Sequence, residues 1–471
     1  MYKRIIALII ALVLWTGTAY AESAPSPEVA AAFAQAATAF EQGDYEGAAT
    51  LLTDVMLLAP REAAYRYFRA LAYQATGNIP AALMDQGIAL AQLENIEIYY
   101  ARAQLLTIDG RYDEAWQDLE KIFAQSGKPT EDGYLMAVRA RGIMGYPAEA
   151  MALAEEGLKI FPNSPGLLSG KGDVLYLQGE FEAALENYQA VLDTGVEAWV
   201  VYYNIAEALF MLGRDEEAQQ ASEKSVALGG TASTKESAAE NYKVVLSDAF
   251  QLPAEEKAVG AEKLQAEGAK LLEAGQYEQA LELLQAAIVL WPGNAIWYEQ
   301  CGDAYFGLEN YEKAGECYGF ALSEAQSPFA IYEKIIAVFQ KSGKTTDEAI
   351  LWGYLSALAP DDALLHNNYA FSLRIAQKPE KALQEYDRAI ELDSETALYY
   401  GGRADLLLDM QRYAEAEEDY NRCIALDPAD EMANVALQIC LSLQGKESEI
   451  DPNAFAALFP DAAPEEDHAS E

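Results

Sequence analysis

The chain has 471 residues, of which 51% are apolar, so it is long enough to bury the core of several domains or of one long repeat array. Its 75 acidic and 32 basic residues give a formal net charge of -43, which repels the phosphates of nucleic acids and of anionic lipids. We therefore expect no nucleic-acid partner, and the simplest role of the acidic surface is to keep a long chain soluble.

Residues 1–21 have the pattern of a secretory signal peptide. Lys3 and Arg4 form its charged region, Ile5–Trp15 its apolar region, and Ala19–Ala21 its small-x-small cleavage site. We expect cleavage after this site and export, so that the chain is secreted, periplasmic or associated with the cell surface. An uncleaved anchor is the alternative, although the apolar run is short for a membrane span. No membrane span is expected after cleavage.

A linker at residues 22–28 leads into a first block of helix-turn-helix units, residues 29–230. Six glycines mark the turns at a nearly constant spacing of about 34 residues: Gly43, Gly77, Gly110, Gly145, Gly179 and Gly213. Glycine is favoured at these places because it readily adopts the positive φ that ends a helix. The spacing predicts about six repeated helical pairs.

The register breaks at residues 231–260, because the next turn glycine after Gly213, Gly275, comes too late for one unit and too early for two. We expect one extra helix and a linker here, with the helix covering the apolar end of the first block. A seventh, eroded repeat is the alternative.

A second block, residues 261–430, contains about five further units, and their spacing is constant. Its turn residues are Gly275, Glu309, Gly343, Gln377 and Gln411. A capping helix is expected at residues 431–446. An acidic, disordered tail is expected at residues 447–471, which contain three prolines.

The units resemble tetratricopeptide repeats, whose pattern has small residues near positions 8 and 20, an aromatic residue at 24 and a proline at 32. In the last unit these positions hold Ala404, Ala416, Tyr420 and Pro428. The resemblance implies an all-α fold: a right-handed superhelical solenoid of tetratricopeptide helix-turn-helix repeats in two blocks. It also implies that the first helix of each pair lines a concave groove.

The same resemblance implies which side chains face the groove and bind a partner. These candidates are Tyr67, Leu71, Tyr100, Arg139, Tyr176, Tyr203, Phe210, Phe306, Asn367, Phe371 and Arg374. Aromatic side chains on such a wall can grip a peptide, because they offer a large area with little entropy to lose. Packing inside the array is the alternative for several of them. Family members that bind a terminal carboxylate use basic residues at position 5, which are missing here, so that mode of binding is not expected.

Four cysteines lie in the second half of the chain as two local pairs, Cys301 with Cys317 and Cys423 with Cys440, and adjacent antiparallel helices can bring each pair together. They are candidate disulfides in an exported protein, and buried free thiols are the equally weighted alternative. None has the spacing of a zinc site, and the chain has only two histidines, so neither a metal nor a cofactor is expected.

The sequence contains no nucleophile beside a base and no phosphate-binding loop, so we do not expect an enzyme. The hypothesis is an exported, non-catalytic scaffold whose groove grips segments of other proteins or peptides. A structural cell-envelope component that self-associates is the alternative. A helical glycosidase that uses groove carboxylates such as Asp303 is a remote one. The oligomeric state is not predicted.

Overall fold

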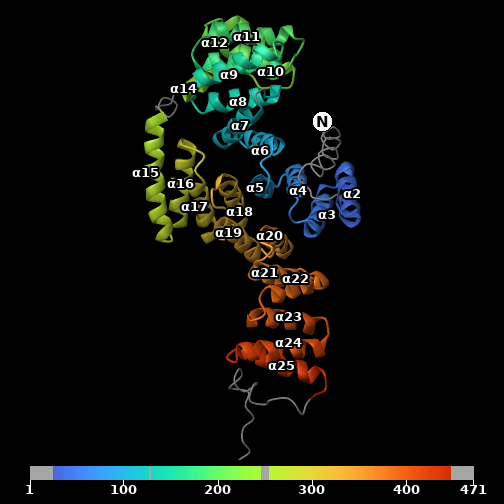
Figure 1. The fold of residues 1–471 in the computed structure, drawn as a ribbon. Helices are drawn as coiled ribbons and strands as arrows, with labels where there is room; N and C mark the ends of the chain where they lie inside the picture. The colour runs from blue at the N-terminus through green and yellow to red at the C-terminus, as the bar shows by residue number, and fades with distance from the viewer. Residues whose placement is uncertain (1–24, 127–128, 246–253, 447–471) are drawn as a thin grey trace, which may run out of the picture. The chain divides into compact units, whose positions relative to one another are not determined.

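The structure is a computed structural model that describes residues 25–126, 129–245 and 254–446 (Figure 1). Within these residues the chain forms 24 α-helices and no strand, which confirms the all-α prediction. The predicted signal segment, residues 1–21, and the predicted disordered tail, residues 447–471, lie outside the described residues.

Six helical pairs make up the first block, as the glycine spacing predicts. The pairs are α2 (Pro27–Gln42) and α3 (Tyr45–Leu58), α4 (Ala63–Thr76) and α5 (Ile79–Gln92), α6 (Ile96–Ile108) and α7 (Tyr112–Ser126), α8 (Glu131–Ile143) and α9 (Pro147–Ile160), α10 (Pro165–Leu177) and α11 (Phe181–Asp193), and α12 (Trp199–Met211) and α13 (Asp215–Ala227). Each short turn reverses the chain, so the two helices of a pair pack side by side, as α12 and α13 do.

The extra helix expected between the blocks is α14 (Lys235–Val245). The second block then contains five pairs and one more helix. They are α15 (Ala254–Glu273) and α16 (Tyr277–Leu290), α17 (Ala295–Gly307) and α18 (Tyr311–Glu324), α19 (Phe329–Lys341) and α20 (Thr345–Leu358), α21 (Ala363–Ile375) and α22 (Pro379–Leu392), α23 (Ala397–Asp409) and α24 (Tyr413–Leu426), and α25 (Glu431–Leu443). With 20 residues, α15 is longer than the other first helices.

Every turn residue that the register predicts has a positive φ, between 58° and 83°. At the first turn, the Gly43 amide donates to the Phe40 carbonyl and the Asp44 amide to the Ala39 carbonyl, which satisfies two carbonyls at the helix end. The Asp44 carboxylate then accepts a hydrogen bond from the Gly47 amide and caps the second helix. Local backbone chemistry therefore sets the repeat length.

Gln411→Gly is expected to raise the free energy of unfolding by about 1 kcal/mol, because a residue with a Cβ is strained in the left-handed region by roughly that amount. Gln411 has a φ of 59°. Urea unfolding followed by circular dichroism measures the change. Gln411→Ala keeps the Cβ and is the control, so equal midpoints for the glycine and alanine variants would contradict strain at this turn.

The predicted capping helix, α25, continues the repeat register. It has 13 residues, like α21 and α23, and the turn after it contains Gly445, whose φ is 71°. Gly445 follows Gln411 at the same spacing as Gln411 follows Gln377. The last described helix therefore occupies the place of the first helix of a further repeat.

By their contacts, the described helices form two compact units that do not coincide with the two blocks of the register. Unit 1 joins the chain up to Arg69 to the part from Tyr332 onward, and unit 2 runs from Ala70 to Ile331. In unit 1, α3 packs against α20, and Lys381 Nζ on α22 donates to the Leu57 carbonyl at 2.6 Å. Packing between helices far apart in sequence thus holds unit 1 together.

In unit 2, α5 of the first block packs along α18 of the second block. The two backbones approach so closely that a Cβ on Gly87 would overlap the carbonyl oxygen of Gly319. All residues of α5 from Ala81 to Leu90 are buried, and α18 is buried over most of the stretch from Ala314 to Leu322. This helix is therefore enclosed by both blocks.

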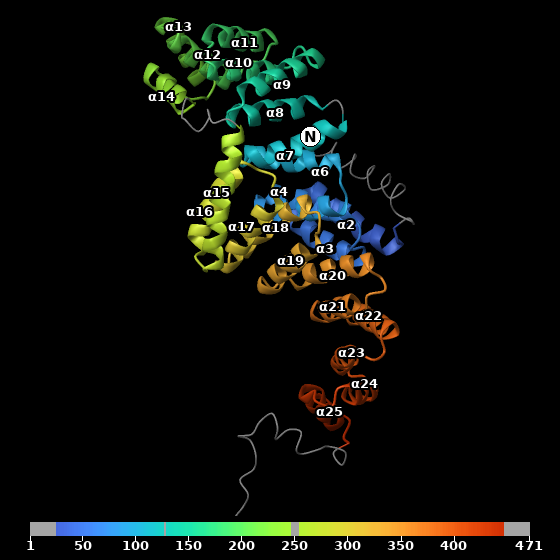
Figure 2. The same ribbon diagram turned by 60° about the vertical axis from the view of Figure 1, so that its left-hand side comes forward.

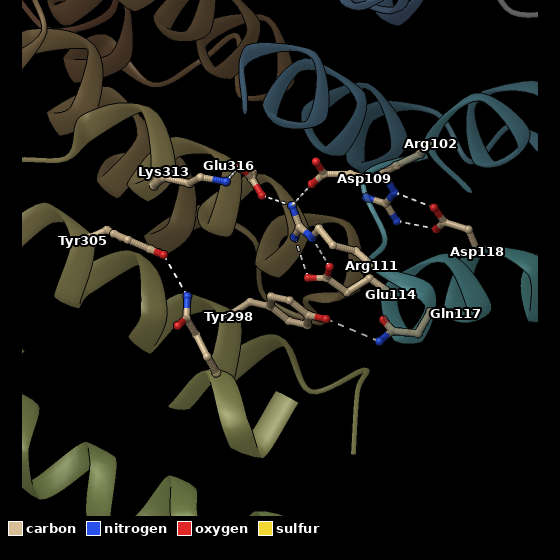
Figure 3. A network of polar contacts seen from close by, with 11 residues as sticks. Arg102, Asp109, Arg111, Glu114, Gln117, Asp118, Tyr298, Tyr305, Lys313 and Glu316 are labelled. Carbon is tan, nitrogen blue, oxygen red and sulfur yellow. Dashed lines mark hydrogen bonds and ion pairs between the residues drawn. The ribbon is translucent and has the colours of Figure 1, made fainter. Parts of the chain in front are cut away.

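A polar network joins α6 and α7 of the first block to α17 and α18 of the second (Figure 3). Arg111, which precedes α7, is paired with Glu114 and with Glu316 of α18, and Lys313 Nζ is 2.9 Å from Glu316 Oε2. Charges of both signs meet here, so the cluster is internally neutralised and joins the two blocks within unit 2.

Candidate functional site

A row of exposed apolar side chains runs over the first helices α21, α23 and α25 of unit 1. We call it the apolar face, and it consists of Leu364, Phe371, Ile375, Leu398, Met432, Ile439 and Leu443. Each of these residues is between 41% and 69% exposed. Single apolar residues are common on protein surfaces, but several large ones on neighbouring helices are typical of an interaction site.

The repeat register places these side chains together. Leu364, Leu398 and Met432 are each separated by one repeat length, so each occupies the second position of its helix. Phe371 and Ile439 likewise share one position of the repeat. Because α21 contacts α23 and α23 contacts α25, the three first helices that carry these side chains are neighbours (Figure 1).

Two carboxylates of α23, paired with one arginine of α21, interrupt the apolar face. Arg374 Nε donates to Asp409 Oδ2 at 2.7 Å, and Arg374 Nη1 is 3.4 Å from Asp405 Oδ2. Burial lowers the pKa of Arg374, but the hydrogen bond to Asp409 and the charge of Asp405 outweigh it and raise that pKa. The Tyr420 hydroxyl donates to Asp405 at 2.8 Å and fixes this carboxylate. Arg374 is therefore already paired with two carboxylates of the same protein.

A shallow pocket adjoins the apolar face at Leu364. It is lined by Ala359–Leu364 and by Tyr399, and two of its lining side chains are the carboxylates of Asp361 and Asp362. Asp362 caps α21 by accepting from the Leu364 amide at 3.0 Å. The Asp361 side chain is 90% exposed and is paired at 3.4 Å with Arg388 of α22, an exposed ion pair of the weak kind.

Phe371 and Arg374 are the two predicted groove residues that lie on this face. Asn367, on the same helix, is buried, and its amide donates to Asn368 Oδ1 at 3.3 Å. Phe306, on α17, packs edge-on against Tyr311 with 5.4 Å between the ring centroids. Asn367 and Phe306 are thus engaged in packing, the alternative that the sequence left open for several candidates.

Two of the predicted groove tyrosines of the first block make contacts with neighbouring helices of the repeat array. The Tyr100 hydroxyl accepts a hydrogen bond from the Thr130 amide at 3.0 Å, at the start of α8. Tyr176 packs against Phe181 and against Tyr242 of α14, with ring centroids 5.3 and 5.9 Å apart. Neither ring is presented as a free anchor for a peptide.

The remaining predicted candidates lie at different depths. Phe210 is buried in the core formed by α10 to α13, and Arg139 on α8 is exposed. Tyr203 is partly buried on α12. Tyr67 and Leu71 are partly buried on α4 and belong to unit 1 and unit 2, respectively.

The extra helix α14 lies against α12, the first helix of the sixth pair (Figure 2). Glu207 of α12 is buried and accepts hydrogen bonds from the hydroxyls of Ser233 and Ser237. The Tyr176 hydroxyl donates to the Ala238 carbonyl at 3.4 Å. The chain itself therefore covers positions of α10 and α12 that were predicted to face a ligand.

The carboxylates at the ninth position of several first helices have a shared structural role. Tyr188 donates to Asp173 at 2.9 Å and Tyr318 to Asp303 at 2.8 Å, as Tyr420 does to Asp405. Burial raises the pKa of Asp173 to about 6, although the hydrogen bond from Tyr188 lowers it. In each case the tyrosine of the second helix ties down the carboxylate of the first.

All four cysteines are free thiols in the structure. Burial raises the pKa of Cys301 to about 12 and that of Cys423 to about 11. Cys317 is close enough to Cys301 for the charge of one thiolate to raise the pKa of the other, after burial as the main cause. Cys423 and Cys440 belong to one core cluster of α23, α24 and α25. Formation of the two disulfides in an oxidising compartment stays a prediction.

Within the described ranges, no group of three or more histidine, cysteine or acidic side chains is arranged to hold a metal ion. The described helices include none that is both long enough and apolar enough to cross a bilayer. The apolar face and its borders offer a ligand apolar area, carboxylates and one paired arginine.

Sequence reasoning missed most of the apolar face, although a signal for it was present. The recurrence of Leu364, Leu398 and Met432 at the repeat spacing is visible in the sequence. Large apolar residues at the second helical position point away from the partner helix of the pair, so their recurrence predicts an exposed apolar row.

A profile described as tetratricopeptide repeat matches residues 33–93, 169–232, 266–330 and 372–431, which together make up more than half of the chain. A UDP-N-acetylglucosamine–peptide N-acetylglucosaminyltransferase of Giardia intestinalis is 31% identical over 139 residues, 28% of this chain and 9% of that protein. The mitochondrial import receptor subunit TOM70 of Saccharomyces cerevisiae is 26% identical over 186 residues, 38% of this chain and 29% of the receptor. The chain thus matches less than a third of the length of either relative.

Among solved structures, the crystal structure of YrrB, described as a TPR protein with an unusual peptide-binding site, has a TM-score of 0.32 and 18% sequence identity. The match covers 37% of this chain and 89% of YrrB. The family assignment rests on the repeat profile, which covers more than half of the chain. The chain belongs to the tetratricopeptide repeat family.

Proposed function

We propose that this chain is an exported, non-catalytic scaffold that binds segments of partner proteins on the apolar face of unit 1. The apolar face carries the proposal, because seven large apolar side chains are exposed on three neighbouring first helices. Stacked helical repeats present extended surfaces of this kind to their partners. The resemblance of part of the chain to an import receptor subunit agrees with a binding role.

Export is part of the proposal and rests on the signal pattern of residues 1–21. The mature chain is expected to begin at Glu22 and to be found outside the cytoplasm. Mass spectrometry of the N-terminal peptide, after cell fractionation, measures this. A cytoplasmic chain that begins at Met1 would contradict it.

The absence of catalysis is also proposed, and the position of Asp303 supports it. The remote glycosidase alternative would use this carboxylate, but Asp303 accepts a hydrogen bond from the Tyr318 hydroxyl inside its own repeat. A glycosidase needs a second carboxyl group across the scissile bond, with water or substrate between the two. A binding scaffold requires no such pair.

Photocrosslinking tests the binding site in the full chain. A photoreactive phenylalanine analogue placed at Leu398 or Met432 is expected to form adducts with a discrete partner protein. The same analogue at Ile108 or Val289, which are 72% and 66% exposed on α6 and α16, is the control and is expected to form none. Adducts at all four positions would contradict a localised site.

Binding of the identified partner is then measured with purified proteins. The double variant Phe371→Ser, Leu398→Ser is expected to weaken binding about tenfold or more, since it removes large apolar area from the contact. The double variant Ile108→Ser, Val289→Ser is expected to bind like the unchanged chain. If the only adduct is a second copy of this chain, the self-associating envelope component replaces the scaffold.

A further inference from the structure

We propose that the segment bound on the apolar face is cationic as well as apolar, a helix or strand in which Leu-like and Phe-like side chains are accompanied by Lys or Arg. This proposal rests on the proposed function and specifies the chemistry of the partner. Its basis is the distribution of charge around the face.

The helices of the apolar face and the loops that lead into them are strongly acidic. Residues 359–375, 393–409 and 427–443 contain nine Asp and Glu side chains but only two arginines, Arg374 and Arg403. Arg374 is paired with Asp405 and Asp409, as described above. Arg403 Nη1 is 2.7 Å from Asp387 Oδ1, and Arg403 Nε is 2.7 Å from Asp419 Oδ2. Neither arginine is left to attract an acidic ligand.

Two further arginines, from α22 and α24, reach these loops. Arg388 Nη2 is 3.4 Å from Asp361 Oδ1, and Arg422 Nη2 is 3.2 Å from Glu395 Oε1. The Asp361 and Glu395 side chains remain 90% and 76% exposed. Exposed pairs of this kind are weak and are easily exchanged for a ligand cation. The loops therefore still present net negative charge.

The pocket beside Leu364 is the site where we expect a lysine or arginine side chain of the partner segment to bind. Its lining combines the carboxylates of Asp361 and Asp362 with Tyr399 and with apolar residues such as Pro360 and Leu364. A lysine or arginine side chain can lay its methylene stem on apolar surface and direct its charged end toward carboxylates or an aromatic ring. Arg388 Nη2 also reaches this lining, where it donates to the Pro360 carbonyl at 3.3 Å, so the two carboxylates outnumber one arginine there and the local charge favours a cation.

The same negative charges disfavour binding of the protein's own tail, or of a second copy of the protein, on the apolar face. The tail, residues 447–471, contains eight Asp and Glu residues and no lysine or arginine. A second copy brings another net charge of -43. Juxtaposed like charges lower affinity, so a separate cationic protein segment is the favoured occupant.

Three labelled peptides of about 18 residues, roughly five helical turns, test the proposal by fluorescence anisotropy with the full chain. They share the same leucines and differ only in their polar residues, which are all Lys, all Gln or all Glu. The Leu/Lys peptide is expected to bind at least about tenfold more tightly than the Leu/Gln peptide, and the Leu/Glu peptide to bind least. The difference is expected to shrink as salt is raised.

Variants on the apolar face, compared with a control pair of exposed apolar residues elsewhere, test whether the peptide binds at this face. Phe371→Ser with Leu398→Ser is expected to weaken the Leu/Lys peptide about tenfold. Asp361→Lys with Glu395→Lys is expected to weaken it while improving the Leu/Glu peptide. The control, Ile108→Ser with Val289→Ser, is expected to change neither. Equal loss in the control would mean nonspecific attraction to an acidic protein and would overturn the proposal.

Failure of this proposal differs from failure of the proposed function. If the Leu/Gln or Leu/Glu peptide binds best, and the Phe371 and Leu398 variant abolishes that binding, the cationic preference is wrong but the binding face stands. If a partner crosslinked at Leu398 keeps its affinity for the Phe371 and Leu398 variant, the face itself is wrong. If the Leu/Lys peptide binds only after removal of residues 447–471, the tail is the natural occupant and the proposal is overturned.

Discussion

Gly87→Val is expected to destabilise unit 2 by about 3 kcal/mol, the upper end of what overpacking usually costs. The backbones of α5 and α18 touch at this residue, so a side chain on Gly87 would clash with the Gly319 carbonyl unless the two helices separate. Separation would expose part of a helix that is now buried on all sides. The measurement is urea unfolding, together with hydrogen exchange of the amides of α5 and α18, which are both expected to exchange faster.

Gly142→Ala is the matched control for this prediction. Gly142 lies within α8 of the same unit, and the nearest side-chain atom to an added Cβ would be 3.8 Å away, an ordinary contact. Alanine there is expected to stabilise the chain by up to about 1 kcal/mol through its better helix propensity. If Gly87→Val behaved like Gly142→Ala, α5 and α18 would not pack against each other in solution.

The repeat register could be predicted from the sequence because local chemistry determines it. A positive φ at Gly43 or Gly275 ends the first helix whatever the rest of the chain does. The spacing also predicted turns at Glu309, Gln377 and Gln411, where the residue type alone gives no indication, and all three have positive φ. Periodicity therefore carried more information than residue preference.

The contact between the blocks was not predicted, because it joins helices that are far apart in the sequence. Gly87 and Gly319 are ordinary helical glycines in the sequence, and only the folded chain brings them together. One local signal was present: Ala81–Leu90 contains few polar residues and is apolar around the helix, which is typical of a helix buried on every side.

The candidate site was predicted in part. The resemblance to the family led to Phe371 and Arg374, which lie on the apolar face, but it also favoured aromatic residues of the first block. Tyr176 is packed beneath α14, and this contact depends on how the segment after the first block folds back. Leu398, which was not among the predicted groove residues, is 56% exposed. Exposure depends on the stacking of first helices, which residue type does not reveal.

Arg102→Met is expected to destabilise unit 2 by about 3–5 kcal/mol, because it leaves the Asp118 carboxylate buried without its counter-charge. Both side chains are 1% exposed, and Arg102 donates to the two oxygens of Asp118 at 2.8 and 2.6 Å (Figure 3). Arg102 also donates to Ser323 Oγ of α18 at 3.0 Å and lies 4.7 Å from the Phe320 ring. Urea unfolding measures the loss.

The double variant Arg102→Met, Asp118→Leu separates the two contributions to this loss. Removing both charges avoids the uncompensated carboxylate, so the double variant is expected to be more stable than Arg102→Met alone. Arg214→Met breaks the exposed pair with Glu217 in the same unit and is expected to leave unfolding unchanged. If the double variant were no more stable than the single one, the destabilisation would come from the lost contacts of Arg102 with α18. The guanidinium would then serve mainly to join the two blocks within unit 2, rather than to neutralise Asp118.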